Sequence, residues 1–333
     1  MKFFNSNSLI AQGLVETKLA REYPFQRIPD KYKNSVRQEL WKISQNSAGV
    51  SIMFETNSPK IVVHWKILSD FKMNHMPNTG IKGLDLYEYK NNSWYYRSTG
   101  IPEGKSNKAI IFENTKRKLR KFRLHLPLYE TLIDLKIGIN DDCSFSNYKT
   151  DLKTIVFYGT SITQGGCASR PGLAYTNIIS RKTEYNCINF GFSGNGHLEP
   201  SVGSILSNIK TNFYVIDCLP NVDIKSIELN VIPLIESIRS SKNSNDKPII
   251  FVEQPECHDD YIEENIYEKN NILKKEILNA INIGYKRIYL IESEDCIGKD
   301  NEATVDGVHY NDIGFKRFAE HLIIKLKKLK IDF

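Results

Sequence analysis

The stretch that decides the fold is Ile155-Val-Phe-Tyr-Gly-Thr-Ser-Ile-Thr-Gln-Gly-Gly166. Its β-prone residues run directly into Gly159-Thr-Ser161, and a polar, glycine-rich turn follows. This pattern predicts a buried strand that ends just before Ser161. Open α/β sheets bind their ligands at the carboxyl ends of parallel strands, so the Ser161 hydroxyl is expected at such an edge. A Gly-x-Ser triplet is common in loops, and it gains weight only from segments elsewhere in the chain.

The second half of the chain alternates between two patterns. Apolar runs predict strands at 154–158, 187–190, 213–218, 249–252 and 287–291. Amphipathic segments between and after them predict helices at 173–184, 198–210, 225–241, 261–282 and 311–329. The repeated strand–helix order predicts an α/β fold, with a doubly wound, five-stranded parallel sheet and helices on both faces.

The first half of the chain is rich in short strand-like runs separated by turns. The runs lie at 50–54, 61–65, 84–89, 94–96, 109–112 and 132–137. This spacing predicts an all-β sandwich, with one short helix within 30–43. A polar stretch at 147–152 separates the two patterns, so we expect domains at 1–150 and 151–333. The basic run at 116–123 alternates with apolar residues and is interpreted as the solvated face of a strand.

Composition excludes several classes of partner. The 45 basic and 39 acidic residues among 333 are interspersed, which argues against a nucleic-acid partner. No stretch approaches the roughly 18 apolar residues of a membrane span, so no membrane partner is expected. Six cysteines without a C-x-x-C pair predict free, mostly buried thiols in a reducing compartment. We therefore expect a cytoplasmic protein, or a secreted or periplasmic one if a signal peptide has been removed.

Four polar segments each follow a predicted strand of the second half. They are Gly159-Thr-Ser161, Asn189-Phe-Gly-Phe-Ser-Gly-Asn-Gly196, Leu219-Pro-Asn221 and Asp306-Gly-Val-His309. Ester cleavage needs a hydroxyl nucleophile, an imidazole base and a carboxylate that orients it. The chain therefore predicts Ser161, His309 and Asp306 as catalytic residues. The backbone N–H groups of Ser161 and Gly194, with the Asn221 amide, are the expected oxyanion hole.

Each of these residues also has a plainer interpretation. Ser161 alone fits a turn or a helix N-cap, and Asn221 after a proline is ordinary turn chemistry. Gly194 and its neighbouring glycines fit turns, and their spacing is not that of a dinucleotide-binding motif. The occurrence of all four segments in one order, each after a strand, favours the catalytic interpretation.

Metal binding is the other alternative for the last segment. Asp306 and His309 fit either a capping pair before the final helix or half of a metal site with His258, Asp259 and Asp260. No familiar ligand spacing accompanies them. We expect no metal and no cofactor.

Together the four segments resemble the blocks of the SGNH (GDSL-type) hydrolases, which have a flavodoxin-like fold. The resemblance implies Ser161 as nucleophile, His309 as base and Asp306 as its orienter, with Gly194 and Asn221 completing the oxyanion hole. Two positions differ from the usual pattern. Thr160 stands where many members have aspartate, and the residue after Asn221 is valine rather than aspartate.

The first half carries a second, narrower resemblance. Met73-Asn-His-Met76 and Gly83-Leu-Asp-Leu-Tyr87 resemble the jelly-roll-like GxDLY domain that precedes a branch of bacterial SGNH esterases. Taken alone, Leu-Asp-Leu-Tyr is simply an alternating strand. Met73 and Met76 are interpreted as core residues. His75 is interpreted either as a loop histidine at the active-site mouth or as one without a role there.

The expected function is hydrolysis of small acyl esters by a serine esterase. The resemblance implies an acetyl group on a carbohydrate, so the expected partner is a small-molecule or oligosaccharide ester. An acyltransferase with the same acyl-enzyme and a non-catalytic glycan-binding protein are the alternatives. Aromatic residues that either stack on a sugar or pack in the core are Trp65, Trp94, Tyr95 and Tyr96. The oligomeric state is left open.

Overall fold

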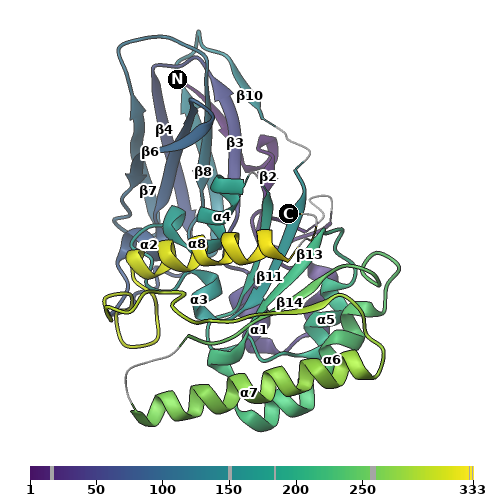
Figure 1. Cartoon of the computed structure of the whole chain (residues 1–333). Helices are drawn as coiled ribbons and strands as arrows, with labels where there is room; N and C mark the ends of the chain where they lie inside the picture. The colour runs from purple at the N-terminus through teal and green to yellow at the C-terminus, as the bar shows by residue number, and fades with distance from the viewer. Residues whose placement is uncertain (16–18, 149–151, 184, 256–259, 330, 332) are drawn as a thin grey trace.

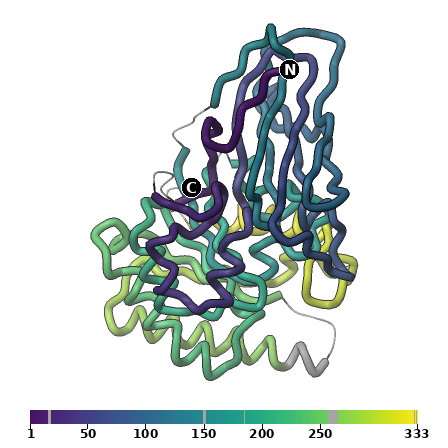
Figure 2. Tube along the Cα trace, turned by 180° about the vertical axis from the view of Figure 1, so that it is seen from behind, coloured from purple at the N-terminus to yellow at the C-terminus, as the bar shows by residue number. Residues whose placement is uncertain are grey.

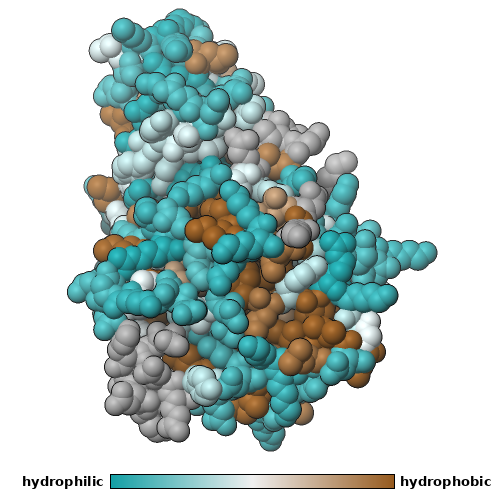
Figure 3. Space-filling view, viewed as in Figure 1, coloured by the Kyte–Doolittle hydropathy of each residue, from teal (hydrophilic) through white to brown (hydrophobic). Residues whose placement is uncertain are grey.

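The computed structural model describes residues 1–15, 19–148, 152–183, 185–255, 260–329, 331 and 333. It has two parts, a β-rich part that we call the sandwich and an α/β part that contains the parallel sheet (Figure 1). In the same view, Figure 3 shows mostly hydrophilic residues over the end of the sandwich and hydrophobic residues gathered over the α/β part.

The α/β part is built on the predicted five-stranded parallel sheet. Its strands are β11 (Thr154–Gly159), β12 (Asn186–Gly191), β13 (Phe213–Asp217), β14 (Ile249–Val252) and β15 (Ile288–Ile291). Their order is β12-β11-β13-β14-β15, and every neighbouring pair is parallel. The winding therefore reverses at β11, which makes the carboxyl end of β11 the place where such sheets bind ligands.

Helices cover both faces of this sheet. One face carries α4 (Tyr175–Thr183) and α8 (Asp312–Lys328), and the other carries α5 (Pro200–Leu206), α6 (Ile224–Arg239) and α7 (Asp260–Asn282). Along β11, Ile155 and Phe157 pack with the first group, whereas Val156 and Tyr158 pack with the second. A strand buried on both faces needs a continuous apolar run, which is what the sequence provides there.

The sandwich has two antiparallel sheets around one hydrophobic core, as predicted. The four-stranded sheet has the order β1-β9-β4-β7: β1 (Lys2–Asn5), β9 (Leu132–Ile139), β4 (Lys60–Ile67) and β7 (Ser106–Glu113). The six-stranded sheet has the order β10-β3-β8-β5-β6, with β2 paired to β3: β10 (Phe145–Asn147), β3 (Ser51–Thr56), β8 (Arg120–His125), β5 (Leu84–Lys90), β6 (Ser93–Gly100) and β2 (Ala11–Gln12). Trp65 is fully buried in the shared core, so it packs rather than offering a sugar a stacking surface.

The remaining elements are short. The α-helices are α1 (Gln38–Ser44), α2 (Asn78–Lys82) and α3 (Ser161–Gln164). The 3-10 turns are η1 (Ser6–Ser8), η2 (Asp30–Ser35), η3 (Pro171–Leu173) and η4 (Leu219–Asn221). The helix expected within 30–43 is therefore two elements, η2 followed by α1.

A segment near the N-terminus belongs spatially to the α/β part. We call residues 19–47 the N-terminal arm, and Figure 2 shows this purple segment running down from the sandwich into the green half of the molecule. Leu40 and Trp41 of the arm are buried in the cluster that contains α5 and α6. Arg27 donates from Nη1 to the carbonyl oxygens of Asn189 (3.2 Å) and Gly191, and burial lowers its pKa to about 9.

The Gly83-Leu-Asp-Leu-Tyr87 segment connects the sandwich to the α/β part through Asp85. Asp85 is fully buried, and its Oδ2 accepts hydrogen bonds from Arg170 Nη1 (2.7 Å) and from the backbone N–H of Gly172 (2.9 Å). Arg170 also donates to the Tyr87 hydroxyl (2.7 Å). A Cβ on Gly172 would lie 2.5 Å from that hydroxyl, so glycine permits the close approach. The segment is thus a strand whose polar side chains form hydrogen bonds with the α/β part.

The basic run at 116–123 forms strand β8 in part, as predicted, but Arg123 is not solvated. Arg123 is only 3% exposed. It donates to Ser180 Oγ (2.8 Å) on α4 and to Ser51 Oγ (3.0 Å) on β3, and burial lowers its pKa to about 10. The interpretation of this run as a solvated face is therefore wrong at Arg123, because the α/β part covers that face of the strand.

The cysteines agree with the sequence where the structure describes them. Cys143, Cys167, Cys187, Cys218 and Cys296 are free and buried. Cys257 lies outside the described residues. None of the described helices combines the length and the apolar character needed to cross a membrane.

Candidate active site

Ser161 lies at the point where β11 turns into α3. A Cβ on Gly159 would lie 2.0 Å from Thr163 Oγ1 and 2.5 Å from the Asp217 carbonyl oxygen, so only glycine fits this turn. Thr160 is the N-cap of α3, and its side chain accepts a hydrogen bond from Ile162 N (3.3 Å). Ser161 is therefore not the capping residue, and its side chain is free for other contacts.

Ser161, His309 and Asp306 come together, as the sequence predicts. Ser161 Oγ lies 2.9 Å from His309 Nε2, and His309 Nδ1 lies 2.8 Å from Asp306 Oδ2. His309 and Asp306 are in the loop between β15 and α8. Ser161 is 7% exposed, whereas the side chains of His309 and Asp306 are 25% and 39% exposed. The site therefore opens to solvent on the side of the imidazole.

Local hydrogen bonds keep Asp306 ionised. Partial burial acts to raise the pKa of Asp306, but the backbone N–H groups of His309 (2.8 Å) and Val308 (3.1 Å), together with the His309 ring, lower it below its usual value. An ionised carboxylate beside Nδ1 favours the tautomer with the proton on Nδ1. The lone pair of Nε2 then faces the Ser161 hydroxyl, which is the arrangement of a general base.

Gly194 and Asn221 occupy neighbouring loops at the same edge. Gly194 has φ +64° in the loop after β12, a left-handed conformation that suits glycine. Asn221 lies in η4. When its amide oxygen faces the backbone, that oxygen accepts hydrogen bonds from Asn195 N (3.1 Å) and Gly196 N (3.3 Å). This orientation ties η4 to the Gly194 loop and leaves the Asn221 NH₂ group as a donor.

The sequence analysis did not identify Asp217, whose carboxylate accepts a hydrogen bond from α3. It ends β13, is 4% exposed, and accepts hydrogen bonds from Thr163 Oγ1 (3.0 Å) and Tyr175 Oη (3.1 Å). Burial raises the pKa of Asp217 to about 6, although these two hydrogen bonds oppose the shift. The available clue was an acidic residue at the end of the apolar strand Phe213-Tyr-Val-Ile-Asp217.

Gln164 was also missed, and it connects the sandwich with the Gly194 loop. Its Nε2 donates to the Leu128 carbonyl oxygen (3.0 Å), and its Oε1 accepts a hydrogen bond from Ser193 N (3.0 Å). Tyr129, beside Leu128, donates its hydroxyl to the Ser161 carbonyl oxygen (3.3 Å). The sandwich therefore contacts α3 directly.

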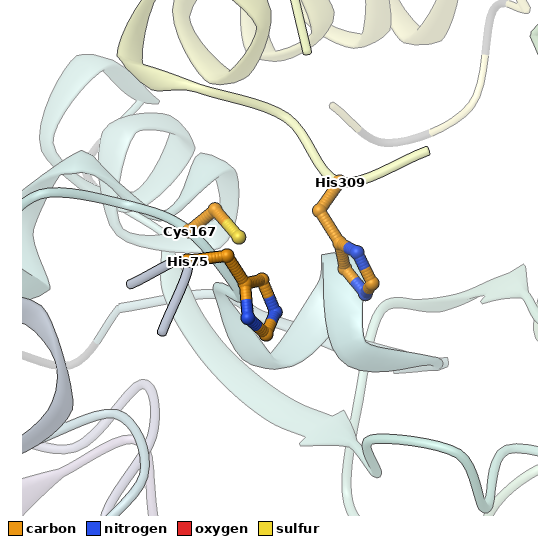
Figure 4. A group of neighbouring side chains, drawn as sticks. All are labelled: His75, Cys167 and His309. Atoms are coloured by element: carbon orange, nitrogen blue, oxygen red, sulfur yellow. The ribbon is translucent and has the colours of Figure 1, made fainter. Parts of the chain in front are cut away.

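His75 and Cys167 lie beside His309 (Figure 4). The ring centroids of His75 and His309 are 5.5 Å apart, so the His75 ring is a direct neighbour of the candidate base. Each of His75, Cys167 and His309 has one metal-ligating atom within 4.8 Å of the others. The alternative metal site with His258, Asp259 and Asp260 falls on His258, Asp259 and the Asp260 side chain, which lie outside the described part of the structure.

Comparison with known families fits this geometry. Residues 152–327 match the model of the GDSL-like lipase/acylhydrolase family. The chain belongs to this family. Residues 1–145 of this GDSL-like hydrolase match a second model, the GxDLY N-terminus of SGNH hydrolase-type esterases. Both resemblances found in the sequence are confirmed, and the chain is a hydrolase of the esterase type.

Solved structures share both parts of the GDSL-like hydrolase. A protein from Bacteroides ovatus ATCC 8483, described as a GDSL-like lipase, is 31% identical, with 100% of this chain and 99% of that chain covered and a TM-score of 0.94. The salicylyl-acyltransferase SsfX3 from a tetracycline biosynthetic pathway is 13% identical, with 98% and 97% covered and a TM-score of 0.78. A family two carbohydrate esterase from Clostridium thermocellum, in complex with cellohexaose, is 13% identical, with 85% and 93% covered and a TM-score of 0.63. The last two share the fold alone. No curated protein sequence matches the chain.

Proposed function

We propose that this GDSL-like hydrolase is a serine esterase that removes small acyl groups, with Ser161 as nucleophile, His309 as base and Asp306 as the residue that orients it. One observation carries the proposal, namely the continuous chain of short contacts from Ser161 Oγ through both ring nitrogens of His309 to Asp306 Oδ2. Such a chain lets a proton leave the hydroxyl while the carboxylate stabilises the imidazolium.

The proposed reaction has two halves. In the first, Ser161 Oγ attacks the ester carbonyl while His309 Nε2 takes its proton, and the oxyanion is held by the N–H groups of Ser161 and Gly194 and by the Asn221 amide. His309 then gives the proton to the leaving alcohol, and an acyl-serine remains. In the second half, water loses a proton to His309 as it attacks the acyl group, and collapse returns the proton to Ser161 with release of the acid.

An acetyl group is the proposed acyl part. A pocket of about 20 Å³ lies next to the candidate site and is lined in part by Ile162, Pro220, Gly307 and Val308, although neither Ser161 nor His309 lines it. An acyl group that enters this pocket has to be small, because a space of roughly 10–15 Å³ holds one water-sized group. The proposed alcohol part is a carbohydrate, in line with the shared fold of the family two carbohydrate esterase.

Acetate release from an aryl acetate and from acetylated mono- and oligosaccharides tests the proposal. Ser161→Ala is expected to lower kcat by about 10⁵–10⁶-fold, as is typical for loss of a serine nucleophile. Ser204→Ala is the matched control, because Ser204 is an exposed residue of α5. Unchanged turnover in Ser161→Ala would refute the nucleophile. Rates that rise from acetyl to longer acyl esters would overturn the acetyl assignment.

Acyl transfer is the second candidate, since the acyltransferase SsfX3 shares both parts of the fold. The exposure of His309 and Asp306 gives water access to the acyl-enzyme and favours hydrolysis. Adding sugar acceptors to the assay separates the two. Transfer products that outnumber free acid would establish acyl transfer. Glycan binding without turnover would instead support the non-catalytic alternative.

A further inference from the structure

We propose that His75, Cys167 and His309 form a Zn²⁺ site whose occupation reversibly inhibits the enzyme. The three residues come from different parts of the chain: a loop of the sandwich, the loop after α3, and the loop before α8. Their ligand atoms all lie within 4.8 Å of one another. Figure 4 shows the Cys167 sulfur and the His75 ring directed toward His309.

The spacing suits zinc after a small adjustment. Zn–N bonds of about 2.0–2.1 Å and a Zn–S bond of about 2.3 Å place tetrahedral ligand atoms roughly 3.3–3.6 Å apart. The most widely separated ligand atoms, up to 4.8 Å apart, therefore need to approach by roughly 1.2–1.5 Å. His75 is partly exposed in the loop between β4 and α2, so its side chain has room to make that movement.

His75 and Cys167 are each prepared for this role by a local contact or conformation. His75 Nδ1 lies 2.9 Å from Asn74 Oδ1, and an amide oxygen only accepts hydrogen bonds, so Nδ1 carries the proton and Nε2 keeps its lone pair. Cys167 has φ +73°, in the left-handed region that disfavours a side chain. Strain of this kind is found where the surrounding structure holds a residue at a functional position. Here it holds the thiol of a buried residue beside His309.

His309 already has the second partner that metal-binding histidines usually have. Its Nδ1–H contacts the Asp306 carboxylate at 2.8 Å, and a carboxylate–histidine–metal chain fixes the ring and strengthens Nε2 as a ligand. A zinc ion on Nε2 takes the lone pair that would accept the Ser161 proton. The inhibition therefore rests on the proposed role of His309 as base, whereas the binding does not.

Coordination requires no oxidant or reductant. The Cys167 S–H bond breaks, its proton passes to solvent, and an S–Zn bond forms, while both imidazoles bind as neutral ligands. Ser161 Oγ, which lies 2.9 Å from His309 Nε2, has to turn away from that nitrogen to admit the ion, and water or this hydroxyl then takes the fourth position of the tetrahedron. Imidazole and thiolate donors together suit Zn²⁺ better than Mg²⁺ or Ca²⁺, which prefer oxygen ligands.

The test compares Zn²⁺ inhibition of the full chain with that of four variants, each rate being divided by the metal-free rate of the same variant. His75→Gln and Cys167→Ser each remove one ligand. His64→Gln and Cys143→Ser are matched controls, because both residues lie in the sandwich outside the three-residue cluster. Outer-shell partners alone are worth about 10–100-fold in metal affinity, so loss of a direct ligand is expected to raise the inhibitory Zn²⁺ concentration at least tenfold.

A second readout is independent of activity. Co²⁺ in place of Zn²⁺ is expected to give a thiolate-to-cobalt charge-transfer band with one ion per chain. The band should persist in the inactive Ser161→Ala variant and disappear in Cys167→Ser. If the protein proved inactive toward esters, this band would still report the metal site, so failure of the proposed function and failure of the site are distinguishable.

Three results would overturn the site. The first is equal inhibition of the parent protein, His75→Gln and Cys167→Ser. The second is activation by Zn²⁺. The third is a charge-transfer band that survives Cys167→Ser, which would place the bound metal at another cysteine.

Discussion

Replacing Asp85 with alanine removes the central acceptor of the contact between the sandwich and the α/β part. Its carboxylate is fully buried and holds Arg170 Nη1 at 2.7 Å and Gly172 N at 2.9 Å. Breaking a buried ion pair costs about 3–5 kcal/mol. Arg170 keeps 21% of its side chain exposed and can recover some hydration, so we take about 3 kcal/mol from this range. The stranded N–H of Gly172 adds about 1 kcal/mol, for a total of about 4 kcal/mol.

Urea unfolding followed by tryptophan fluorescence measures this loss, because buried tryptophans report on both parts. Trp65 lies in the core of the sandwich, and Trp41 of the N-terminal arm lies in the core of the α/β part. Glu113→Ala is the control. Its carboxylate is 64% exposed and 3.0 Å from Lys60 Nζ, so its removal should cost less than about 1 kcal/mol.

A double-mutant cycle with Arg170→Ala isolates the ion pair. If Asp85 acts largely through Arg170, the cost of Asp85→Ala should fall by about 2 kcal/mol or more in the Arg170→Ala background. The reasoning is refuted if Asp85→Ala costs no more than the Glu113→Ala control, or if the two substitutions are additive.

Three further predictions follow from contacts around the site and the interface. Asn221→Ala should lower kcat by about 10²–10³-fold with little change in KM, measured with an aryl acetate, and an unchanged kcat would exclude Asn221 from the oxyanion hole. Asp217 has a pKa of about 6 in the folded protein against an ordinary value of 3.8, so its contribution to stability is full below about pH 4 and is lost as the pH rises through 6. Urea unfolding at pH 4.5 and 7.5 should therefore show that Asp217→Asn lacks about 2 kcal/mol of this pH dependence, and parallel curves for variant and parent would contradict it. Gly172→Ala places a Cβ 2.5 Å from the Tyr87 hydroxyl and should lower the free energy of unfolding by about 1–3 kcal/mol, measured by urea or thermal unfolding. Gly104→Ala is the control, because a Cβ there has no atom within 4 Å, and it should cost less. Equal costs for the two variants would argue against the close approach at Gly172.

The sequence predicts the sheet and the candidate triad because both depend on local patterns. An apolar run such as 155–158 marks a strand buried on both faces, and parallel strands must gather their carboxyl ends at one edge. Ser161 and His309 could therefore be placed together although 148 positions separate them. The two family resemblances gave each of them a role, which stays a proposal until the variants are measured.

Contacts between the two parts could not be predicted in the same way. The partner of Asp85 is Arg170, and nothing in the spacing of these residues indicates which segments meet. The exposure of Arg123 was predicted wrongly for the same reason, because the alternating sequence pattern of a strand is the same whether its polar face contacts water or another part of the protein. His75 could be placed only once the loops were folded together. The boundary near residue 150 stays a proposal.

The position of the N-terminal arm has a consequence for biosynthesis. Leu40 and Trp41 leave the ribosome early, but their packing partners in β12 and α6 are about 150–200 residues further along. At about 5–20 residues per second, translation takes roughly 8–40 s to supply them. During that interval Leu40 and Trp41 of the nascent chain lack the residues against which they are buried in the folded protein. Chaperone demand during synthesis should therefore centre on this short early segment, before Ser161 has been translated.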